Sequence, residues 1–379
     1  MGKHIKRCKV LLLAAYIILL SACAPAVNFR KSSDDLSDDL TYTDTHVTGT
    51  LCEGVSVDAD FPDLSQVTSY PIISGQMKKT DEEVIQKIKD YIFRDYKPEE
   101  IQKETASDSQ LVNYYISGTG EDWKKSLGVY GAPDETGFIA WDYEAYPYYF
   151  ITDNRGILPT EGMEIYPFIN SGIENLSFMG REEAVKEVKD KLAQWNIPIT
   201  GEPLVYTLDG ETMYQLLENW NQSGYTATDL EDVTTEMLDC YYMIFDTGYQ
   251  GIPYTFFMRT VEGKYYNGAR LECHLTKQGI VEMEYHWAEY DVEEVESHES
   301  ALSIEEALAG LQRHFEQTVL TSEIDILKIY FQYVPVKAGE SDGSYVFAPA
   351  WVFQPAGEVA GEYGYLDPVF IHAITGEEI

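Results

Sequence analysis

The sequence predicts an α+β fold made of tandem units in which a helix packs on an antiparallel sheet. Three amphipathic helical patterns recur along the chain, and strand-like sequence follows each of them. Between the second and third patterns, apolar and polar residues alternate as in a β-hairpin. A helix that is apolar on one face only is suited to cover a sheet, so this repeated order implies stacked helix-on-sheet units.

The first 22 residues have the pattern of an export signal. Basic residues within positions 3–9 precede the uncharged apolar run Val10–Leu20, an order typical of a secretory signal peptide. A helix needs about 20 apolar residues to cross a bilayer, so this run is too short for a comfortable span. The residues Leu20–Cys23 resemble a bacterial lipobox. This resemblance implies cleavage after Ala22, a diacylglycerol with fatty chains such as palmitate on Cys23, and a location on the outer face of the cell membrane.

Two other interpretations of this segment stay open. Ordinary secretory cleavage after Ala24 would place Pro25 beside the cleaved bond, which is a poor position for that reaction. An uncleaved membrane helix would have to continue through Pro25 before it met Arg30, and proline costs about 3 kcal/mol inside a helix. Two acyl chains hold a protein stably at a membrane, and we therefore favour the lipid anchor on Cys23.

The mature chain is predicted to begin with a flexible acidic tether over residues 23–48, because this segment has few large apolar residues. The whole chain has 27 Lys and Arg against 64 Asp and Glu. Removal of residues 1–22 takes four basic side chains and no acidic one, which leaves 23 against 64 and a formal charge of −41. This charge argues against a nucleic-acid partner, which needs clustered basic residues. It also repels anionic lipids, so the anchor must hold the protein at the membrane.

Capping boxes, in which a hydroxyl and a carboxylate bind backbone donors reciprocally, mark two helix starts at Thr80–Glu83 and Ser303–Glu306. The second helix is predicted over residues 181–195. The expected buried stripes are Val84, Ile88, Tyr91 and Ile92; Ala184, Val188, Leu192 and Trp195; and Leu308, Leu311 and Phe315. Each stripe has helical spacing, so each helix should lie on a sheet.

The hairpin is predicted between Ala269 and Trp287, with a three-residue loop at Lys277–Gly279. Gly279 occupies the position that favours a left-handed residue. The expected pairs are Leu275 with Val281, Cys273 with Met283, and His274 with Glu282 on the outer face. Cys240 and Cys273 could also face each other across strands, but we favour reduced, buried thiols for Cys52, Cys240 and Cys273.

The third helix is followed by strand-like residues 326–335, 345–353 and 369–374. The acidic stretch Glu289–Glu299 is expected to be a linker. These patterns divide the mature chain into three α+β domains, over residues 49–165, 166–290 and 298–379.

Three motifs of the last unit, Ile304–Ala307, Pro349–Val352 and Ala373–Glu377, resemble PepSY-type repeats. They are most similar to the C-terminal domain of YycI and YycH, extracytoplasmic regulators of a cell-wall histidine kinase. Residues 182–184 suggest a second, degenerate copy, and the N-terminal block is similar to uncharacterised surface lipoproteins of clostridia-like Gram-positive bacteria. The chain departs from YycI and YycH in having His372 where Asp is usual, and a lipid anchor in place of a membrane helix. The resemblance implies PepSY- or cystatin-like domains with a regulatory role at the envelope.

The sequence contains no H-E-x-x-H or S-x-x-K motif and no phosphate-binding glycine loop. We therefore expect a non-catalytic protein with no cofactor and no metal ion. His274 and His286 lie close in sequence to Glu282 and Glu284, but an exposed sheet face explains this pattern without a cation. Asp58, Asp60 and Asp63 lack the central Gly and the bidentate Glu of a calcium loop.

One aromatic cluster is the candidate ligand-binding site. Its residues are Trp141, Tyr143, Tyr146, Tyr148 and Tyr149. Such rings stack on the apolar faces of glycans or on peptides, although a strand pair in the domain core is the simpler explanation. We expect a binding or regulatory module with an envelope protein as partner. The alternative is a solute- or glycan-binding lipoprotein that uses this cluster.

Overall fold

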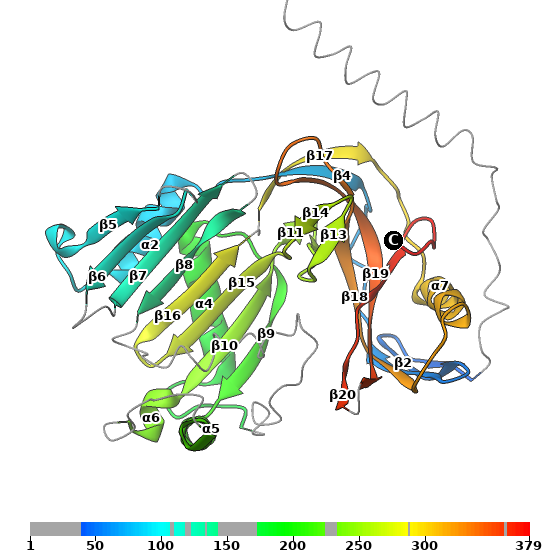
Figure 1. Ribbon diagram of the computed structural model, residues 1–379, viewed down its shortest axis with the longest axis horizontal. Helices are drawn as coiled ribbons and strands as arrows, with labels where there is room; N and C mark the ends of the chain where they lie inside the picture. The colour runs from blue at the N-terminus through cyan, green and yellow to red at the C-terminus, as the bar shows by residue number, and fades with distance from the viewer. Residues whose placement is uncertain are drawn as a thin grey trace, which may run out of the picture.

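The computed structural model describes residues 39–106, 110–117, 123–132, 135–142, 173–223, 233–286, 289–359 and 362–379. Within these residues the chain forms one sheet of nine strands, one sheet of eight strands and two small two-stranded sheets. The two large sheets form two lobes that lie side by side, as Figure 1 shows.

The nine-stranded sheet joins the two ends of the described chain. In spatial order its strands are β1 (Thr41–Tyr42), β2 (His46–Cys52), β3 (Val55–Asp60), β18 (Ile324–Ala338), β19 (Ser344–Val359), β4 (Ile72–Met77) and β17 (Tyr290–Glu296), and β20 (Glu362–Tyr365) and β21 (Val369–His372) each pair with β19. Strand β3 pairs with β18 in parallel, between residues 55–57 and 324–326. A parallel pair needs a long crossover connection, and here the whole eight-stranded lobe lies within that connection.

Helix α7 (Ile304–Glu316) covers one face of the nine-stranded sheet, and its buried residues include Ala307, Leu308 and Leu311. Gly310 lets the helix approach β21 closely, since a Cβ atom there would lie 3.1 Å from Cγ2 of Ile371. The opposite face is covered by a smaller cluster around Phe257 and Phe370. Because both faces are covered, the long hairpin β18–β19 is apolar along most of its length.

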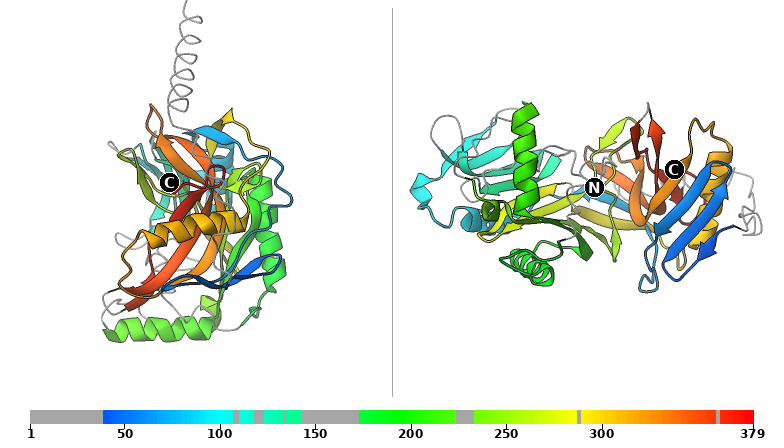
Figure 2. Two further views of the ribbon diagram at one scale, coloured as in Figure 1. Left: turned by 90° about the vertical axis from the view of Figure 1, so that its right-hand side faces the viewer. Right: turned by 90° about the horizontal axis from the view of Figure 1, so that it is seen from below.

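The eight-stranded sheet is antiparallel throughout. Its spatial order is β5 (Gln102–Thr105), β6 (Val112–Ser117), β7 (Trp123–Ala132), β8 (Glu135–Asp142), β16 (Gly279–His286), β15 (Arg270–Thr276), β10 (Cys240–Asp246) and β9 (Thr200–Leu208). Helices α2 (Glu82–Ile92) and α4 (Arg181–Trp195) pack on one face, and the short 3-10 helix η2 (Pro98–Glu100) precedes β5. Helices α5 (Gly210–Ser223) and α6 (Thr235–Leu238) lie on the other face (Figure 2).

The segment between β10 and β15 connects the two lobes. It forms the hairpins β11 (Gly248–Tyr249) with β12 (Ile252–Pro253) and β13 (Arg259–Val261) with β14 (Lys264–Tyr266). Both strands flanking this segment belong to the eight-stranded sheet, yet Ile252, Tyr254 and Tyr266 are buried in the core of the nine-stranded lobe. Strands β4 and β17 also run across the top of the molecule between the lobes (Figure 1). The segment between two strands of the eight-stranded sheet therefore contributes core residues to the nine-stranded lobe.

The predicted fold class is wrong. The protein is mostly β, with two large multi-strand sheets, and it does not consist of tandem helix-on-sheet units of the PepSY or cystatin-like type. Helix α7 is followed by the hairpin β18–β19 and by strand β21, which is the expected order of elements. However, the nine-stranded sheet also contains β1 to β4, which come from residues 41–77. The expected boundaries near residues 165 and 290 therefore do not separate the two sheets.

Two segments expected to be irregular are strands. The tether was expected to reach residue 48, but β1 and β2 begin within it, and Val47 is fully buried. The acidic stretch expected to be a linker contains β17, which pairs with β4 through Tyr290 and Met77. As the end strand of its sheet, β17 exposes most of its carboxylates to water, so its composition resembles that of a linker.

The local predictions were more accurate. Helix α4 spans Arg181–Trp195 and buries the four expected residues. Ser303 and Glu306 form the capping box of α7, whereas α2 begins after Asp81 with no side-chain cap, so the capping box expected at Thr80 is absent. No helix of the described residues is long and apolar enough to span a membrane.

The predicted hairpin is β15–β16, with Cys273 opposite Met283 and His274 opposite Glu282. A register shift after His274 places Leu275 opposite Ile280, so the expected pair of Leu275 and Val281 is wrong. Cys52, Cys240 and Cys273 are free thiols. Cys240 lies on the α5 face of its sheet and Cys273 on the α4 face, so these two cannot form a disulfide.

Candidate functional site

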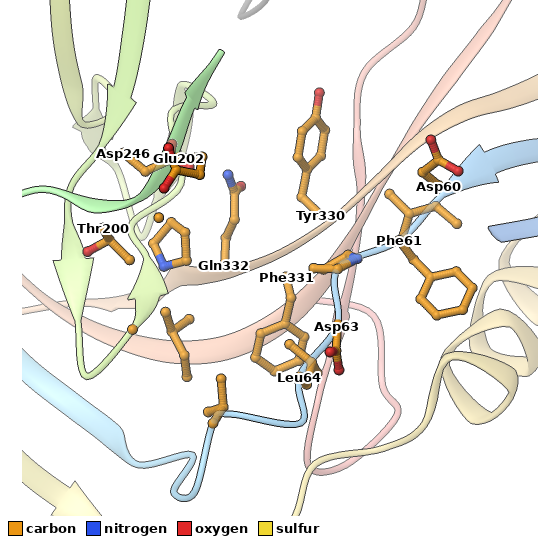
Figure 3. Close-up of a pocket in the computed structure, with 17 residues that line it drawn as sticks. Asp60, Phe61, Asp63, Leu64, Thr200, Glu202, Asp246, Tyr330, Phe331 and Gln332 are labelled. Atoms are coloured by element: carbon orange, nitrogen blue, oxygen red, sulfur yellow. The ribbon is translucent and has the colours of Figure 1, made fainter. Parts of the chain in front are cut away.

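A cavity of about 380 Å³ lies at the junction of the two lobes (Figure 3). We call it the junction cavity. It is lined by the loop after β3, the start of β9, the end of β10, strand β12 and the central part of β18. The lining residues used below are Asp60, Asp63, Leu64, Thr200, Glu202, Asp246, Ile252, Ile329, Phe331 and Gln332. Its walls therefore come from both lobes.

The cavity exists because one edge of β18 is incomplete. On this edge β18 pairs with β3 only over residues 324–326, and the next contact is the bridge between Tyr254 and Tyr333. Between these two contacts, no strand of the described residues is paired with β18 on this side. The backbone oxygen of Tyr333 accepts a hydrogen bond from Thr255 across the same edge. Because strand residues alternate in direction, the backbone polar groups of Ile329 and Phe331 also point toward the gap.

The other walls are shaped by turns. At the end of β3, the side chain of Asp63 accepts hydrogen bonds from the backbone N–H and the hydroxyl of Ser65, at 2.8 and 2.9 Å. Between β11 and β12, Gln250 and Gly251 both have positive φ, 49° and 82°, as a two-residue hairpin turn requires. In β10, a register shift between Ile244 and Asp246 ends the regular pairing with β9.

Four carboxylates line the junction cavity, and no basic side chain does. Three of the four have partners. Asp60 pairs with His46 at 2.8 Å, Glu202 pairs with Lys189 at 2.6 Å, and Asp63 binds Ser65.

Asp246 differs from the other three carboxylates. It is half-buried and has no ion-pair or hydrogen-bond partner among the described residues. Burial raises the pKa of Asp246 to about 6, because the charged form loses water and gains no cation.

Gln332 is the second polar residue without a complete set of partners. Its side chain is only 2% exposed, and its Oε1 atom accepts no hydrogen bond from the described residues. A buried acceptor left unsatisfied costs about 1–3 kcal/mol. In Figure 3 the side chains of Tyr330 and Gln332 extend from one side of β18, and that of Phe331 extends from the other.

Apolar residues form the remaining surface of the cavity. Ile252, Ile329 and Phe331 are buried in the core of the nine-stranded lobe and present one side to the cavity. Leu64 is half-buried beside them. An apolar wall with a few unpaired polar groups is the usual composition of a small-molecule site.

Most of the candidates from the sequence lie elsewhere. Of the aromatic cluster, Trp141 is in β8, opposite Glu282 and Ser126 and away from the junction cavity. Tyr143, Tyr146, Tyr148 and Tyr149 fall outside the described residues, as does Cys23. The arrangement of the cluster therefore stays a prediction.

Both histidines of the central hairpin, His274 and His286, are buried. His274, expected on an outer face, is 2% exposed, and its Nδ1 lies 2.6 Å from Oε2 of Glu282. On the same face Glu272 accepts a hydrogen bond from the Tyr242 hydroxyl at 2.7 Å. No group of three or more His, Cys, Asp or Glu side chains is placed to hold a metal ion within the described ranges.

Sequence reasoning missed Asp246 and Gln332, although both carry a signal. Asp246 ends the apolar strand Cys240–Phe245, and Gln332 interrupts the apolar run of β18. A polar residue inside a buried strand needs a structural or functional explanation. The convergence of these two residues on one cavity depends on the pairing of distant strands.

Comparisons with known proteins add information on the fold. No family model matches the chain, and no curated protein does. Among solved structures, the chain is similar to an uncharacterised protein from Eubacterium rectale ATCC 33656, solved at 1.45 Å resolution, with a TM-score of 0.63 and 16% identity. The match covers 92% of this chain and 97% of that one. The arrangement of the two lobes therefore recurs in a protein of very different sequence.

Proposed function

We propose that this protein is a lipid-anchored extracytoplasmic binding protein, held at the outer face of the membrane through Cys23, and that its ligand is a small molecule bound in the junction cavity. The observation that carries the binding role is a cavity of about 380 Å³ with both apolar walls and unpaired polar groups. Ligand sites are usually about 300–1,000 Å³ in volume and often lie at the boundary between structural units.

The position of the cavity supports a sensing role. A ligand there would contact β9 and β10 of one lobe and β18 of the other. Binding would therefore stabilise one relative arrangement of the lobes, since anything that binds only one state shifts the equilibrium toward it. A change of this kind could be read by an envelope protein beside the anchor.

The anchor is proposed from the sequence alone. The basic segment, the short apolar run and Leu20–Cys23 support it, and the excess of acidic residues leaves no electrostatic attraction to anionic lipids. The tether would then hold the two lobes away from the membrane surface.

A ligand panel tests the binding role. Full-length protein in detergent is heated in the presence of single amines, amino acids, sugars and nucleosides, and the unfolding temperature is recorded. We expect at least one compound to raise this temperature, because a ligand that binds the folded state stabilises it.

Two tryptophan variants locate the effect. Leu64→Trp places a larger side chain on the cavity wall and should abolish the shift, whereas Val319→Trp, at a site 89% exposed, should retain it. The absence of a shift from every compound, or an equal shift in Leu64→Trp, would contradict the proposal.

A further inference from the structure

We propose that the ligand of the junction cavity is an organic cation, an alkylammonium or arylalkylammonium compound. Its charged head would lie at Asp246 and Gln332, and its apolar body against the open edge of β18. This inference rests on the proposed binding role and names the chemical class of the ligand.

The first argument is the unpaired carboxylate. Asp246 is half-buried at the end of β10 and has no ion-pair or hydrogen-bond partner among the described residues, whereas Asp60 lies 2.8 Å from Nδ1 of His46 and Glu202 pairs with Lys189. A charge removed from water without a partner is costly unless something compensates it. An ammonium group in the cavity would supply the missing counter-charge and hydrogen-bond donors.

The second argument is the direction of the unpaired hydrogen bonds. The Asp246 carboxylate can only accept hydrogen bonds when ionised, and the buried Oε1 acceptor of Gln332 has no donor among the described residues. Both groups therefore need a ligand that donates. An ammonium group has up to three N–H donors and no acceptor, whereas a carboxylate or phosphate would offer acceptors and a repelled charge.

The third argument is the negative electrostatic potential inside the cavity. Four carboxylates and no basic side chain line it, and the whole chain has a formal charge of −37. A concave site lined by one sign of charge concentrates ligands of the opposite sign. An anionic ligand would enter against this field and meet no lysine or arginine.

The fourth argument is the apolar wall, which separates an organic cation from a metal ion. Ile252, Ile329 and Phe331 border the cavity and are each less than 5% exposed. Such a surface favours an apolar body next to the charge. A bare metal ion would need several convergent ligands, and the described residues offer no group of three that could hold one.

The ligand-side test uses three probes of nearly equal shape. Tyramine is a cation, 4-ethylphenol is its neutral analogue, and 3-(4-hydroxyphenyl)propanoate is an anion. Binding to the full-length protein in detergent is measured by calorimetry at pH 7.5. We expect tyramine to bind at least tenfold more tightly than 4-ethylphenol, and the anion not to bind. Equal affinity for tyramine and 4-ethylphenol, or tighter binding of the anion, would overturn the inference.

The protein-side test compares two Asp→Asn variants. Asp246→Asn keeps the shape of the side chain and should weaken tyramine binding at least tenfold, while 4-ethylphenol binding stays the same. The matched control is Asp291→Asn, an exposed carboxylate of β17 that does not line the cavity, and it should bind tyramine as the unmodified protein does. Unchanged tyramine binding in Asp246→Asn would refute the role of this carboxylate.

Proton release gives a second readout. Because burial raises the pKa of Asp246 to about 6, a bound cation should lower that pKa again. Tyramine binding at pH 6 should therefore release protons, and calorimetry in buffers of different ionisation enthalpy would detect them. No proton release at pH 6 from the unmodified protein would contradict the contact between the ammonium group and Asp246.

The experiments distinguish failure of the cationic-ligand inference from failure of the proposed binding role. If neutral compounds bind in the cavity as well as tyramine does, and Leu64→Trp abolishes their binding, the binding role stands and the cationic ligand is wrong. If no compound of the panel binds, both proposals fail.

Discussion

Asp246 has a destabilising charge at neutral pH. Its pKa is raised to about 6 by burial, against an ordinary value of 3.8 in the unfolded chain. Between pH 3.8 and 6 the folded protein therefore binds more protons than the unfolded chain, so this residue makes folding more favourable as the pH falls through that window. Above pH 6 the carboxylate is charged in both states, and its destabilising effect is complete.

Asp246→Asn should therefore stabilise the protein in a pH-dependent way. A rise of the pKa from 3.8 to about 6 corresponds to about 3 kcal/mol, and partial contact with water reduces the expected gain to about 1–2 kcal/mol at pH 7. The gain should fall toward zero at pH 4. Urea unfolding at both pH values measures it, with Asp291→Asn as the exposed control. A gain of the same size at pH 4 and pH 7 would contradict the assigned cause.

Gly279 is constrained in two ways at the turn of the central hairpin. Its φ is 104°, and a Cβ atom would lie 2.5 Å from the hydroxyl oxygen of Tyr91 in α2. The same hydroxyl accepts a hydrogen bond from the backbone N–H of Ile280 at 2.8 Å. The absence of a side chain at Gly279 thus leaves room for the hydrogen bond between Tyr91 of α2 and the hairpin.

Gly279→Ala should destabilise the protein by about 2–3 kcal/mol, because it combines backbone strain with a steric clash. Gly263→Ala separates the two effects. Gly263 also has positive φ, 82°, but no atom lies within 4 Å of the position that a Cβ atom would occupy, so about 1 kcal/mol is expected there. Thermal or urea unfolding compares the variants. Equal losses would show that the contact with Tyr91 is unimportant.

At the scale of elements, the two helix starts with capping-box sequences behave differently. In α7 the Ser303 hydroxyl accepts from the backbone N–H of Glu306 at 3.3 Å, and the Glu306 carboxylate accepts from the backbone N–H of Ser303 at 3.0 Å. The N-cap residue of α2 is Asp81, whose side chain makes no capping hydrogen bond and instead pairs with Lys78 at 3.3 Å. The capping-box sequence should therefore contribute more to the free energy of unfolding in α7 than in α2.

Ser303→Ala should cost about 1 kcal/mol of stability, the usual loss for removing a helix cap. Asp81→Ala should cost less than half of that, because it removes only an exposed ion pair. Urea unfolding of both variants measures the difference. A larger loss for Asp81→Ala than for Ser303→Ala would contradict this assignment of the caps.

The same contrast explains which elements the sequence could predict. Helix α4 and the β15–β16 hairpin depend on residues close together in the chain, and their periodicity predicted them. The pairing of Val55–Val57 with residues 324–326 has no local signal, and β17 has the acidic composition of a linker. The helix-on-sheet plan is therefore wrong as a fold class, because the order of strands in the two large sheets depends on pairing between distant segments.

At the scale of the whole molecule, the candidate site results from the nonlocal pairing that the sequence does not reveal. The cavity needs an incomplete edge of β18, the end of β10 and the loop after β3. Asp60 and Asp246 are far apart in sequence, and nothing in their local patterns links them. The polar interruption at Gln332 was visible in the sequence, but its meaning required the sheet order. The proposed anchor depends on local sequence alone, because the pattern that predicts it lies within 23 consecutive residues.

The lipid anchor is tested by Cys23→Ser, with Cys52→Ser as the matched control, since Cys52 is a half-buried free thiol of β2. In a Gram-positive host, the unmodified chain and Cys52→Ser should lack residues 1–22, gain the mass of a diacylglycerol and enter the detergent phase. Cys23→Ser should retain residues 1–22 and gain no lipid mass, because serine has no thiol to form the thioether. Intact mass and phase partitioning measure both properties. If Cys23→Ser has the processing, mass shift and partitioning of the unmodified chain, the anchor is wrong and the protein must reach its location by another route.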